Sequence, residues 1–338
     1  MSRRQLAMVM DLNKCLGCQT CTSACKTQWT NRRGRDDMLW NHVETQPGRG
    51  YPRDWRGSGG GFDGAGRLRP GRIPDRARDY GAPFEVNHAQ ALNPLGALAR
   101  PTAPHLGPDT PPSFGPGWDE DQGAGAYPNS WFFYLPRICN HCTNPACLAA
   151  CPRGAIYKRD EDGIVLVDQK RCRGYQHCIG ACPYKKVYFN PTFGRSEKCI
   201  LCYPRVEQGL APACAQQCPG RIRFVGYLDD EAGAVHALVT RWRVALPLHA
   251  EFGTGPNVYY VPPLSPDKLD DQGRPTGERR IPDAFLVELF GPRAPEVLGV
   301  LQAEREKRRR GEPSALMDLL IAYRHDEIFR VSRRKGAT

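Results

Sequence analysis

The fifteen cysteines of this 338-residue chain fall into four tight groups whose spacing could hold iron–sulfur clusters. The groups are Cys15, Cys18, Cys21 and Cys25; Cys139, Cys142, Cys147 and Cys151; Cys172, Cys178 and Cys182; and Cys199, Cys202, Cys214 and Cys218. The first group reads C-x2-C-x2-C-x3-C, which is the ligand run of bacterial ferredoxins. The third group has the same stepping, with Tyr175 in the second slot. The spacing therefore predicts a chain that carries electrons.

The spacing suits a cluster for a geometric reason. The iron atoms of a cubane [4Fe-4S] cluster lie a few ångström apart, so a tight C-x2-C-x2-C loop can place three thiolates on one cluster. The fourth cysteine begins the next segment, and in two-cluster ferredoxins it ligates the other cluster. Proline follows the last cysteine of three groups, at Pro152, Pro183 and Pro219, whereas Lys26 follows Cys25.

Two other uses of cysteine fit the pattern poorly. Structural zinc needs two C-x2-C pairs for each ion, and the first and third groups do not divide in that way. Disulfide frameworks belong to small secreted domains, and a chain of 338 residues is too long to need one. Iron–sulfur ligation is the interpretation that accounts for both count and spacing.

The basic composition does not indicate nucleic-acid binding. The formal net charge is +11. Fifteen thiolates would add about −15, and three [4Fe-4S] cores with one [3Fe-4S] core would return about +7. The loaded protein would then keep about +3, so much of the basic excess balances buried anionic clusters. The sequence also contains no nucleic-acid recognition motif.

Nothing in the sequence predicts an active site of the chain's own. Gly59, Gly60 and Gly61 lack the helix that a nucleotide-binding glycine loop would need. No Ser/His/Asp set or pair of carboxylates is evident. We expect the chain to space, orient and tune cofactors and not to hold a substrate.

The location of the protein stays open at this point. The first ten residues resemble no signal peptide, and no run of about 18 apolar residues predicts a membrane span. A cytoplasmic protein is one expectation. Export together with a partner that carries its own signal is the other.

Short strands are expected around the cysteine groups. They lie at 7–11, 131–135, 155–157, 164–167, 186–189, 222–225 and 258–261. The pair 155–157 and 164–167 predicts a hairpin between the second and third groups, as in two-cluster ferredoxins.

Residues 47–130 differ in composition from the rest, with 16 Gly and 13 Pro in 84 positions. Such a composition is typical of disordered segments. Bulky aromatic residues are nevertheless spread through it, among them Trp55, Phe62, Tyr80, Phe84, Phe114 and Trp118. We therefore expect an ordered but irregular segment that covers clusters and contacts a partner.

The last fifty residues predict helices. Pro295 suits a first helical position, and Val297, Leu298 and Leu301 form an apolar face before the charged run 304–310. We interpret that run as a solvated helix end. A second helix is expected to begin near Ser314, with Leu316, Leu319, Leu320 and Tyr323 at helical spacing.

Several stretches together resemble the iron–sulfur β subunit of molybdenum enzymes of the dimethyl sulfoxide reductase family. They are LNKCLGCQTC (12–21), VET (43–45), RICNHC (137–142), CRGY (172–175), CPYKK (182–186), AEREK (303–307) and IAYR (321–324). Within that family the chain is similar to the branch with nitrate, selenate, chlorate and perchlorate reductases and dimethylsulfide, ethylbenzene and steroid C25 dehydrogenases. The cysteine motifs are shared by the wider family. Tyr175 and the stretch 43–45 are more specific to the branch.

The resemblance implies a ligand set for each cluster. Three [4Fe-4S] clusters would be held by Cys15, Cys18, Cys21 and Cys218; by Cys25, Cys199, Cys202 and Cys214; and by Cys139, Cys142, Cys147 and Cys182. The fourth site would have only Cys151, Cys172 and Cys178. A phenol is a poor ligand near neutral pH, so Tyr175 marks a vacant ligand position and the site would be [3Fe-4S]. A labile fourth iron bound by water or His177 is the alternative, and His141 is expected to hydrogen-bond a cluster sulfur.

The implied fold class is α+β, with two nested ferredoxin-like modules. Residues 1–46 with 187–228 would form the first module and 131–186 the second, with the irregular insert 47–130 and a C-terminal extension 229–338 that binds a partner. The subunit would relay single electrons between a molybdenum (bis-molybdopterin guanine dinucleotide) catalytic subunit and a haem b subunit or other redox partner. The resemblance favours a periplasmic location. A subunit of another complex, such as a formate dehydrogenase or a four-cubane reductase, and a stand-alone iron–sulfur sensor are the alternatives.

Overall fold

The computed structural model describes residues 4–35, 37–81, 123–324 and 328–331. The strands are β1 (Leu6–Asp11), β2 (His42–Gln46), β3 (Phe133–Arg137), β4 (Ile156–Lys158), β5 (Val165–Val167), β6 (Val187–Asn190), β7 (Arg195–Lys198), β8 (Arg223–Tyr227), β9 (Leu246–Pro247), β10 (Val258–Val261), β11 (Asp267–Leu269), β12 (Pro275–Arg279) and β13 (Phe329–Arg330). The α-helices are α1 (Thr20–Cys25), α3 (Ala146–Ala149), α4 (His177–Ala181), α5 (Tyr203–Val206), α6 (Ala213–Gln216), α7 (Ala234–His236), α8 (Asp283–Phe290), α9 (Ala294–Arg309) and α10 (Ala315–Ile321). Short 3-10 or π turns lie at Leu12–Lys14, Lys26–Thr30, Trp55–Ser58, Arg76–Tyr80, Ala237–Arg241 and Ala250–Phe252.

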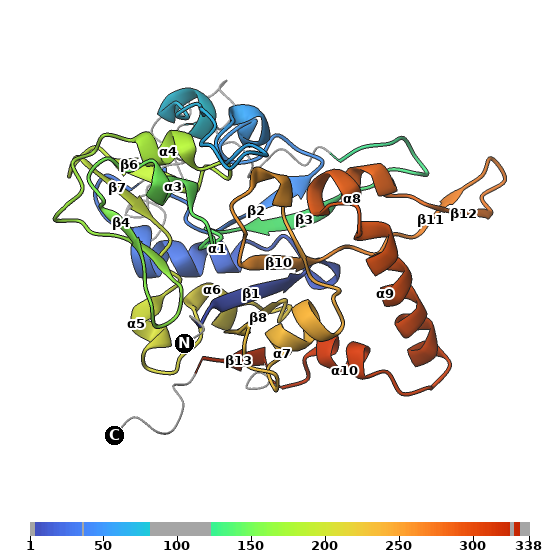
Figure 1. Cartoon of the computed structure of the whole chain (residues 1–338). Helices are drawn as coiled ribbons and strands as arrows, with labels where there is room; N and C mark the ends of the chain where they lie inside the picture. Colours follow the sequence, from blue (N-terminus) through green and yellow to red (C-terminus); the bar gives the residue numbers. More distant parts are fainter. Residues whose placement is uncertain (1–3, 36, 82–122, 325–327, 332–338) are drawn as a thin grey trace, which may run out of the picture.

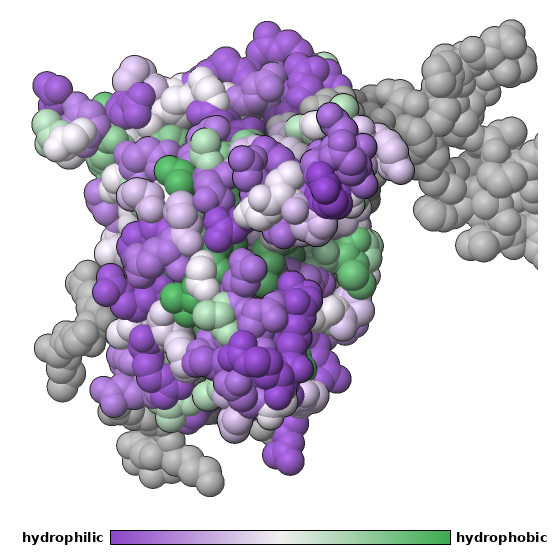
Figure 2. Space-filling model, turned by 90° about the vertical axis from the view of Figure 1, so that its right-hand side faces the viewer, coloured by the Kyte–Doolittle hydropathy of each residue, from purple (hydrophilic) through white to green (hydrophobic). Residues whose placement is uncertain are grey.

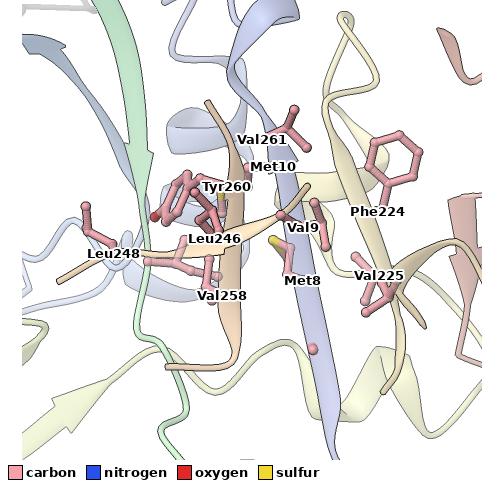
Figure 3. Close-up of a cluster of buried hydrophobic side chains, with 14 of the residues drawn as sticks. Met8, Val9, Met10, Phe224, Val225, Leu246, Leu248, Val258, Tyr260 and Val261 are labelled. Atoms are coloured by element: carbon pink, nitrogen blue, oxygen red, sulfur yellow. The ribbon is translucent and has the colours of Figure 1, made fainter. Parts of the chain in front are cut away.

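A five-stranded sheet lies at the centre of the described structure, in the order β13-β8-β1-β10-β9 (Figure 1). Strand β1 pairs antiparallel with β8 and parallel with β10. All six residues of β1 are buried, because side chains are covered on both faces. Figure 3 shows Met8 and Met10 of β1 among apolar side chains of the neighbouring strands, such as Val225 and Tyr260. Burial on both faces explains why this strand reads as one continuous apolar run.

Two pairs of short helices carry most of the cysteine-bearing turns. Helix α1 packs against α6, and helix α3 packs against α4. Two antiparallel hairpins, β4–β5 and β6–β7, lie beside these helices, and the first matches the predicted hairpin. The helices are only one or two turns long, so packing and not intrinsic helix propensity must stabilise them.

Strands β2 and β3 pair antiparallel, with His42 opposite Arg137. At their centre the buried Glu44 carboxylate forms an ion pair with Arg137 and accepts hydrogen bonds from His42 Nε2 at 2.7 Å and the Tyr51 N–H at 2.9 Å. Burial alone would raise the pKa of Glu44, but the Arg137 guanidinium and the His42 contact hold it below its usual range. The Arg137 guanidinium also lies 3.5 Å from the centre of the Trp55 ring. Glu44 thus ties the ferredoxin-like part to the start of the insert.

The described part of the insert packs closely on α4. The Gly61 N–H donates to the Ala181 carbonyl at 2.9 Å, and a Cβ at Gly71 would lie 2.1 Å from the Gly180 carbonyl oxygen. Only glycine permits that backbone-to-backbone approach. Of the aromatic residues in the insert, Trp55, Phe62 and Tyr80 are buried, whereas Phe84, Phe114 and Trp118 lie outside the described residues.

The C-terminal helices follow the sequence pattern. Helix α9 buries Val297, Leu298 and Leu301, and helix α10 begins with Ser314, whose hydroxyl accepts from the Met317 N–H at 3.2 Å. The charged run pairs with nearby carboxylates, for example Arg309 with Glu306 at 2.7 Å. The side of the molecule that carries α9 is accordingly covered mostly by hydrophilic residues (Figure 2). Among the described helices, none is both long and apolar enough to cross a bilayer.

The structure departs from the predicted elements in a few places. Strand β3 begins two residues late, at Phe133, and runs on to Arg137 because it pairs with β2, which the sequence pattern did not indicate. Helix α10 ends at Ile321, since Ala322 adopts a left-handed conformation, so Tyr323 lies outside the helix and is exposed. Strand β7, helix α8 and the projecting β11–β12 hairpin were also not predicted.

Replacing Glu44 by Gln should destabilise the protein strongly. The substitution would leave the buried Arg137 cation without its counter-ion, and breaking a buried ion pair costs about 3–5 kcal/mol. We expect the midpoint of thermal unfolding to fall by roughly 5–10 °C. Glu278→Gln is the matched control, because the Glu278 carboxylate pairs with Lys268 in solvent. Equal midpoints for the two variants would contradict the role given to Glu44.

Candidate iron–sulfur sites

All fifteen cysteines are free thiols, and most are withdrawn from solvent. Cys18 is exposed, three others are half-buried (Cys15, Cys142 and Cys151), and the remaining eleven are buried. A cluster ligand must be a thiolate, and buried thiolates need a compensating positive charge. Among the described residues, no three Cys, His, Asp or Glu side chains converge closely enough to hold a single metal ion.

The first set joins the first cysteine group to the last cysteine of the chain. Burial raises the pKa of Cys15 to about 11, and the nearby Cys21 and Cys218 thiolates add to the rise. The charge of Arg223 acts to lower the pKa of both Cys15 and Cys18. The turn after Cys218 comes close to the first loop at Gly220, where a Cβ would lie 2.7 Å from the Lys14 carbonyl oxygen.

The second set joins Cys25 to the rest of the fourth group. Burial raises the pKa of Cys25 well above its usual value, and the charges of three neighbouring cysteines add to it, namely Cys199, Cys214 and Cys202. These four cysteines line one enclosed cavity, together with Trp29, Trp40 and Asn41 among others. The tryptophan indole Trp29 Nε1 donates to Cys202 Sγ at 3.0 Å.

The third and fourth sets come from the second and third groups. Burial raises the pKa of Cys142 to about 12, with added repulsion from Cys139 and Cys182, and Cys147 interacts with the same two thiols. Burial raises the pKa of Cys178 to about 11, and the Cys151 and Cys172 thiolates contribute to that rise.

The packing of the helices in pairs explains why each set combines cysteines from two different sequence groups. Helix α1 contains Cys21 and Cys25, while α6 contains Cys214 and is followed by Cys218. Cysteines four residues apart lie about one helical turn apart along the axis, so each helix presents one thiol at each end. Because α1 packs on α6, Cys21 lies near Cys218, which follows the last turn of α6. Cys25 lies near Cys214, which is in the first turn of α6. The α3–α4 pair repeats this arrangement with its own cysteines.

The four sets follow one another in a row. Cys21 of the first set and Cys214 of the second interact with each other and share the side chain of Arg223. Cys199 of the second set interacts with Cys139 of the third. The third and fourth sets lie at the two ends of the α3–α4 pair. The row therefore has two inner members and two outer ones.

Both outer members reach the surface. Cys18 is exposed, and Leu16 beside it is 67 % exposed. At the other end Tyr175 is 59 % exposed, and its ring makes an edge contact with the His177 ring at 6.5 Å between centroids. The Tyr175 side chain thus lies at the protein surface, at the position of the third cysteine group where the sequence pattern expects a ligand.

The surroundings fit anionic clusters. Several buried donors have no hydrogen-bond partner among the described residues, and they include Trp40 Nε1, Asn41 Nδ2 and His141 Nε2. The first two belong to residues that line the cavity of Cys25. His141 Nδ1 accepts from the Val165 N–H at 3.1 Å, so its proton sits on Nε2, and burial lowers the pKa of the ring. Inorganic sulfides are acceptors that such buried donors require.

Further donors already contact the thiols. The backbone N–H groups of Leu201, Ala155 and Ser196 approach Cys199, Cys151 and Cys172 at 3.3–3.4 Å. Sequence reasoning missed these groups, and it also missed Trp29 and Arg223. No motif could have found them, because each lies far from its cysteine in the sequence or acts through its backbone.

Comparison with known proteins agrees with this geometry. The family described as "4Fe-4S dicluster domain" matches residues 130–228, which contain the second, third and fourth groups. The β subunit of dimethylsulfide dehydrogenase from Rhodovulum sulfidophilum is 61% identical over 98% of this chain and 100% of its own length. The β subunit of selenate reductase from Thauera selenatis is 56% identical over 96% of this chain and 98% of its own. The chain belongs to the β subunits of dimethyl sulfoxide reductase-family enzymes.

More distant members share most of the chain as well. The β chain of respiratory nitrate reductase 1 from Escherichia coli is 36% identical over 85% of this chain and 75% of its own length. This β subunit is therefore an iron–sulfur protein that transfers electrons, and the resemblance seen in the sequence is confirmed.

Substituting Cys218 and Cys182 in turn should separate the sets. Cys218→Ser is expected to disturb the site of Cys15 and Cys21, which interact with it. Cys182→Ser is expected to disturb the site of Cys142 and Cys147. Each variant should lose up to about four irons and one reduced-state electron paramagnetic resonance (EPR) signal. The variants serve as controls for each other, and loss of the same signal in both would contradict the grouping.

Proposed function

We propose that this β subunit carries three [4Fe-4S] clusters and one [3Fe-4S] cluster. The ligands would be Cys15, Cys18, Cys21 and Cys218; Cys25, Cys199, Cys202 and Cys214; Cys139, Cys142, Cys147 and Cys182; and Cys151, Cys172 and Cys178. The electrostatic neighbours of each cysteine support these sets, and the packing of α1 on α6 and of α3 on α4 supports two nested modules. The single observation that carries the proposal is the row of four sets with surface access at both ends.

The proposed role is a relay of single electrons between two redox partners. Clusters supply one-electron chemistry when bound. The chain's own residues keep the two inner sets dry, since all their cysteines except the half-buried Cys142 are buried. They also direct N–H donors at the thiols and thereby stabilise negative charge there.

One partner would be a molybdenum catalytic subunit. The relatives named above are β subunits of a dehydrogenase and a reductase, which supports an assembly with a separate catalytic chain. The other partner would be a haem b subunit or another redox protein. We further propose export to the periplasm together with the catalytic subunit, which fractionation of cells would test. Recovery with the cytoplasmic fraction would contradict that location.

The two exposed ends offer surfaces for these partners. Beside Cys15 lies a hollow of about 810 Å³, lined by Phe132, Tyr134 and Leu264 among other residues. Lys14, Arg280, Arg305 and Arg309 also line it, so it suits an apolar segment that bears carboxylates. At the other end a hollow of about 520 Å³ borders His177 and Gly180. Exposed apolar residues next to an electron-transfer site are typical of a protein interface.

The first test is EPR spectroscopy of the oxidised and reduced complex with iron quantified. The proposal expects about 15 irons and an isotropic signal near g of about 2.01 in the oxidised state, as for one [3Fe-4S] centre. About 16 irons with no oxidised-state signal would show four cubanes and would contradict the three-iron site.

Replacing Tyr175 by Cys should convert the three-iron site toward four irons. The substitution restores a thiol at the slot next to Cys172 and Cys178, so the oxidised-state signal should weaken and the iron count should rise by about one. Tyr323→Cys is the control, since Tyr323 is also exposed (62 %) but lies in the C-terminal tail. An unchanged spectrum in the Tyr175 variant would contradict the vacant ligand position.

Leu16→Asp should weaken assembly with the partner at the Cys18 end. A charge at this exposed apolar residue would oppose burial in an interface without disturbing the core. The amount of catalytic or haem subunit recovered with the tagged β subunit should fall at least about tenfold, which is roughly 1.4 kcal/mol. Leu210→Asp, at a 44 % exposed apolar residue between α5 and α6, is the control. Equal recovery in both variants would contradict an interface at Leu16.

A further inference from the structure

Arg223 is a fully buried cation between two cysteine sets. It is the first residue of β8, an interior strand of the central sheet, and pairs with Met10 of β1, and helix α6 packs against β8. Its exposed fraction is 0 %, and it is among the largest fully buried side chains of the described structure. The relay mechanism given above does not use it.

The two ends of the guanidinium contact different sets. Nη2 donates to Cys21 Sγ at 3.2 Å and to Asn41 Oδ1 at 2.8 Å. Nη1 approaches Cys214 Sγ at 3.8 Å and Met8 Sδ at 3.7 Å. Cys21 belongs to the outer set of Cys15 and Cys218, whereas Cys214 belongs to the inner set of Cys25. One side chain therefore bridges the first two members of the row.

The counter-charges of Arg223 are the thiolates themselves. Within the described part of the chain, the main charges acting on Arg223 are those of cysteines and not of carboxylates. Its electrostatic partners are Cys21, Cys214, Cys218 and Cys15. A buried cation without an anion is strongly disfavoured. The geometry makes sense when both neighbouring sites are anionic, as cysteine-ligated clusters are.

On the basis of the proposed function, we propose that Arg223 sets the reduction potentials of the two clusters that it bridges. Each one-electron reduction of a cluster would add one negative charge to that site. A fixed positive charge in contact with both sets stabilises that added charge in either place. It also offsets the repulsion between neighbouring reduced sites. Arg223 would thus raise the reduction potentials of both clusters. It would also weaken the repulsion by which one reduced cluster opposes reduction of its neighbour.

A second buried cation occupies the next interval and gives an internal comparison. Lys198 Nζ donates to the Cys199 carbonyl at 2.9 Å and interacts with Cys139, Cys147 and Cys199. Lys198 therefore lies between the second and third sets, one step along the row from Arg223. Its influence should fall on a different pair of clusters.

The test is a redox titration of the purified complex monitored by EPR, with iron measured in each sample. In Arg223→Gln the two midpoint potentials that belong to the sets of Cys21 and Cys214 should move downward together, and the other two should not change. Arg223→Lys keeps the charge and should restore most of the shift. In Lys198→Gln the shift should fall on the second and third sets instead. Signals are assigned from the Cys218→Ser and Cys182→Ser variants.

Two results would overturn the proposal. Full iron content with four unchanged potentials in Arg223→Gln would show that the Arg223 charge does not influence the potentials. Because all four clusters would still be present, that result would not contradict the proposed electron relay. A uniform shift of all four potentials, or the same pattern in Arg223→Gln and Lys198→Gln, would show a general effect. If Arg223→Gln loses iron, the potentials of Arg223→Lys decide whether the positive charge is responsible. Native potentials there support the role of the charge, and lowered potentials in spite of the charge contradict it.

Discussion

The structure depends on holding many thiolates where water is scarce. Most of the fifteen cysteines are buried, and burial raises the pKa of thiols such as Cys25, Cys142 and Cys214. A bare thiolate is unfavourable in such places, so each site needs positive charge from iron and hydrogen-bond donors from the protein. Buried donors without partners in the described structure, such as Trp40 Nε1 and His141 Nε2, meet that need.

The same constraint explains the unusual number of buried cations. Arg223 and Lys198 are almost fully buried, and in a protein without anionic cofactors each would be costly. Arg223 and Lys198 lie at successive intervals of the row of cysteine sets. Net basicity in this chain is therefore a property of its interior as well as of its surface. That conclusion agrees with the charge balance expected from the composition.

A repeated packing of two short helices creates the row of cysteine sets. Two short helices, each with one cysteine in it and another at its end or just after it, pack together and bring cysteines of two sequence groups close to each other. The α1–α6 and α3–α4 pairs use this packing at different distances along the chain. The central sheet and the Glu44–Arg137 pair hold the two units and the insert together. Rigid spacing follows from this packing, and spacing is what an electron relay requires of its protein.

The sequence by itself determined the chemistry and the family. Cysteine spacing is a local property, since a C-x2-C-x2-C loop fits a cluster wherever the fold places it. The strands β1 and β10, the β4–β5 hairpin and helices α9 and α10 were likewise predicted, because continuous apolar runs and helical periodicity are local signals.

The tertiary structure alone decided how distant residues meet. The approach of Cys25 to Cys214, of Trp29 to Cys202 and of Arg223 to Cys21 depends on packing between segments that lie far apart in the chain. Strand β2 was missed for the same reason, since its buried polar residues are satisfied only by Arg137 and the insert. A residue's local pattern carries no information on a partner about two hundred positions away, because only the folded chain brings the two together.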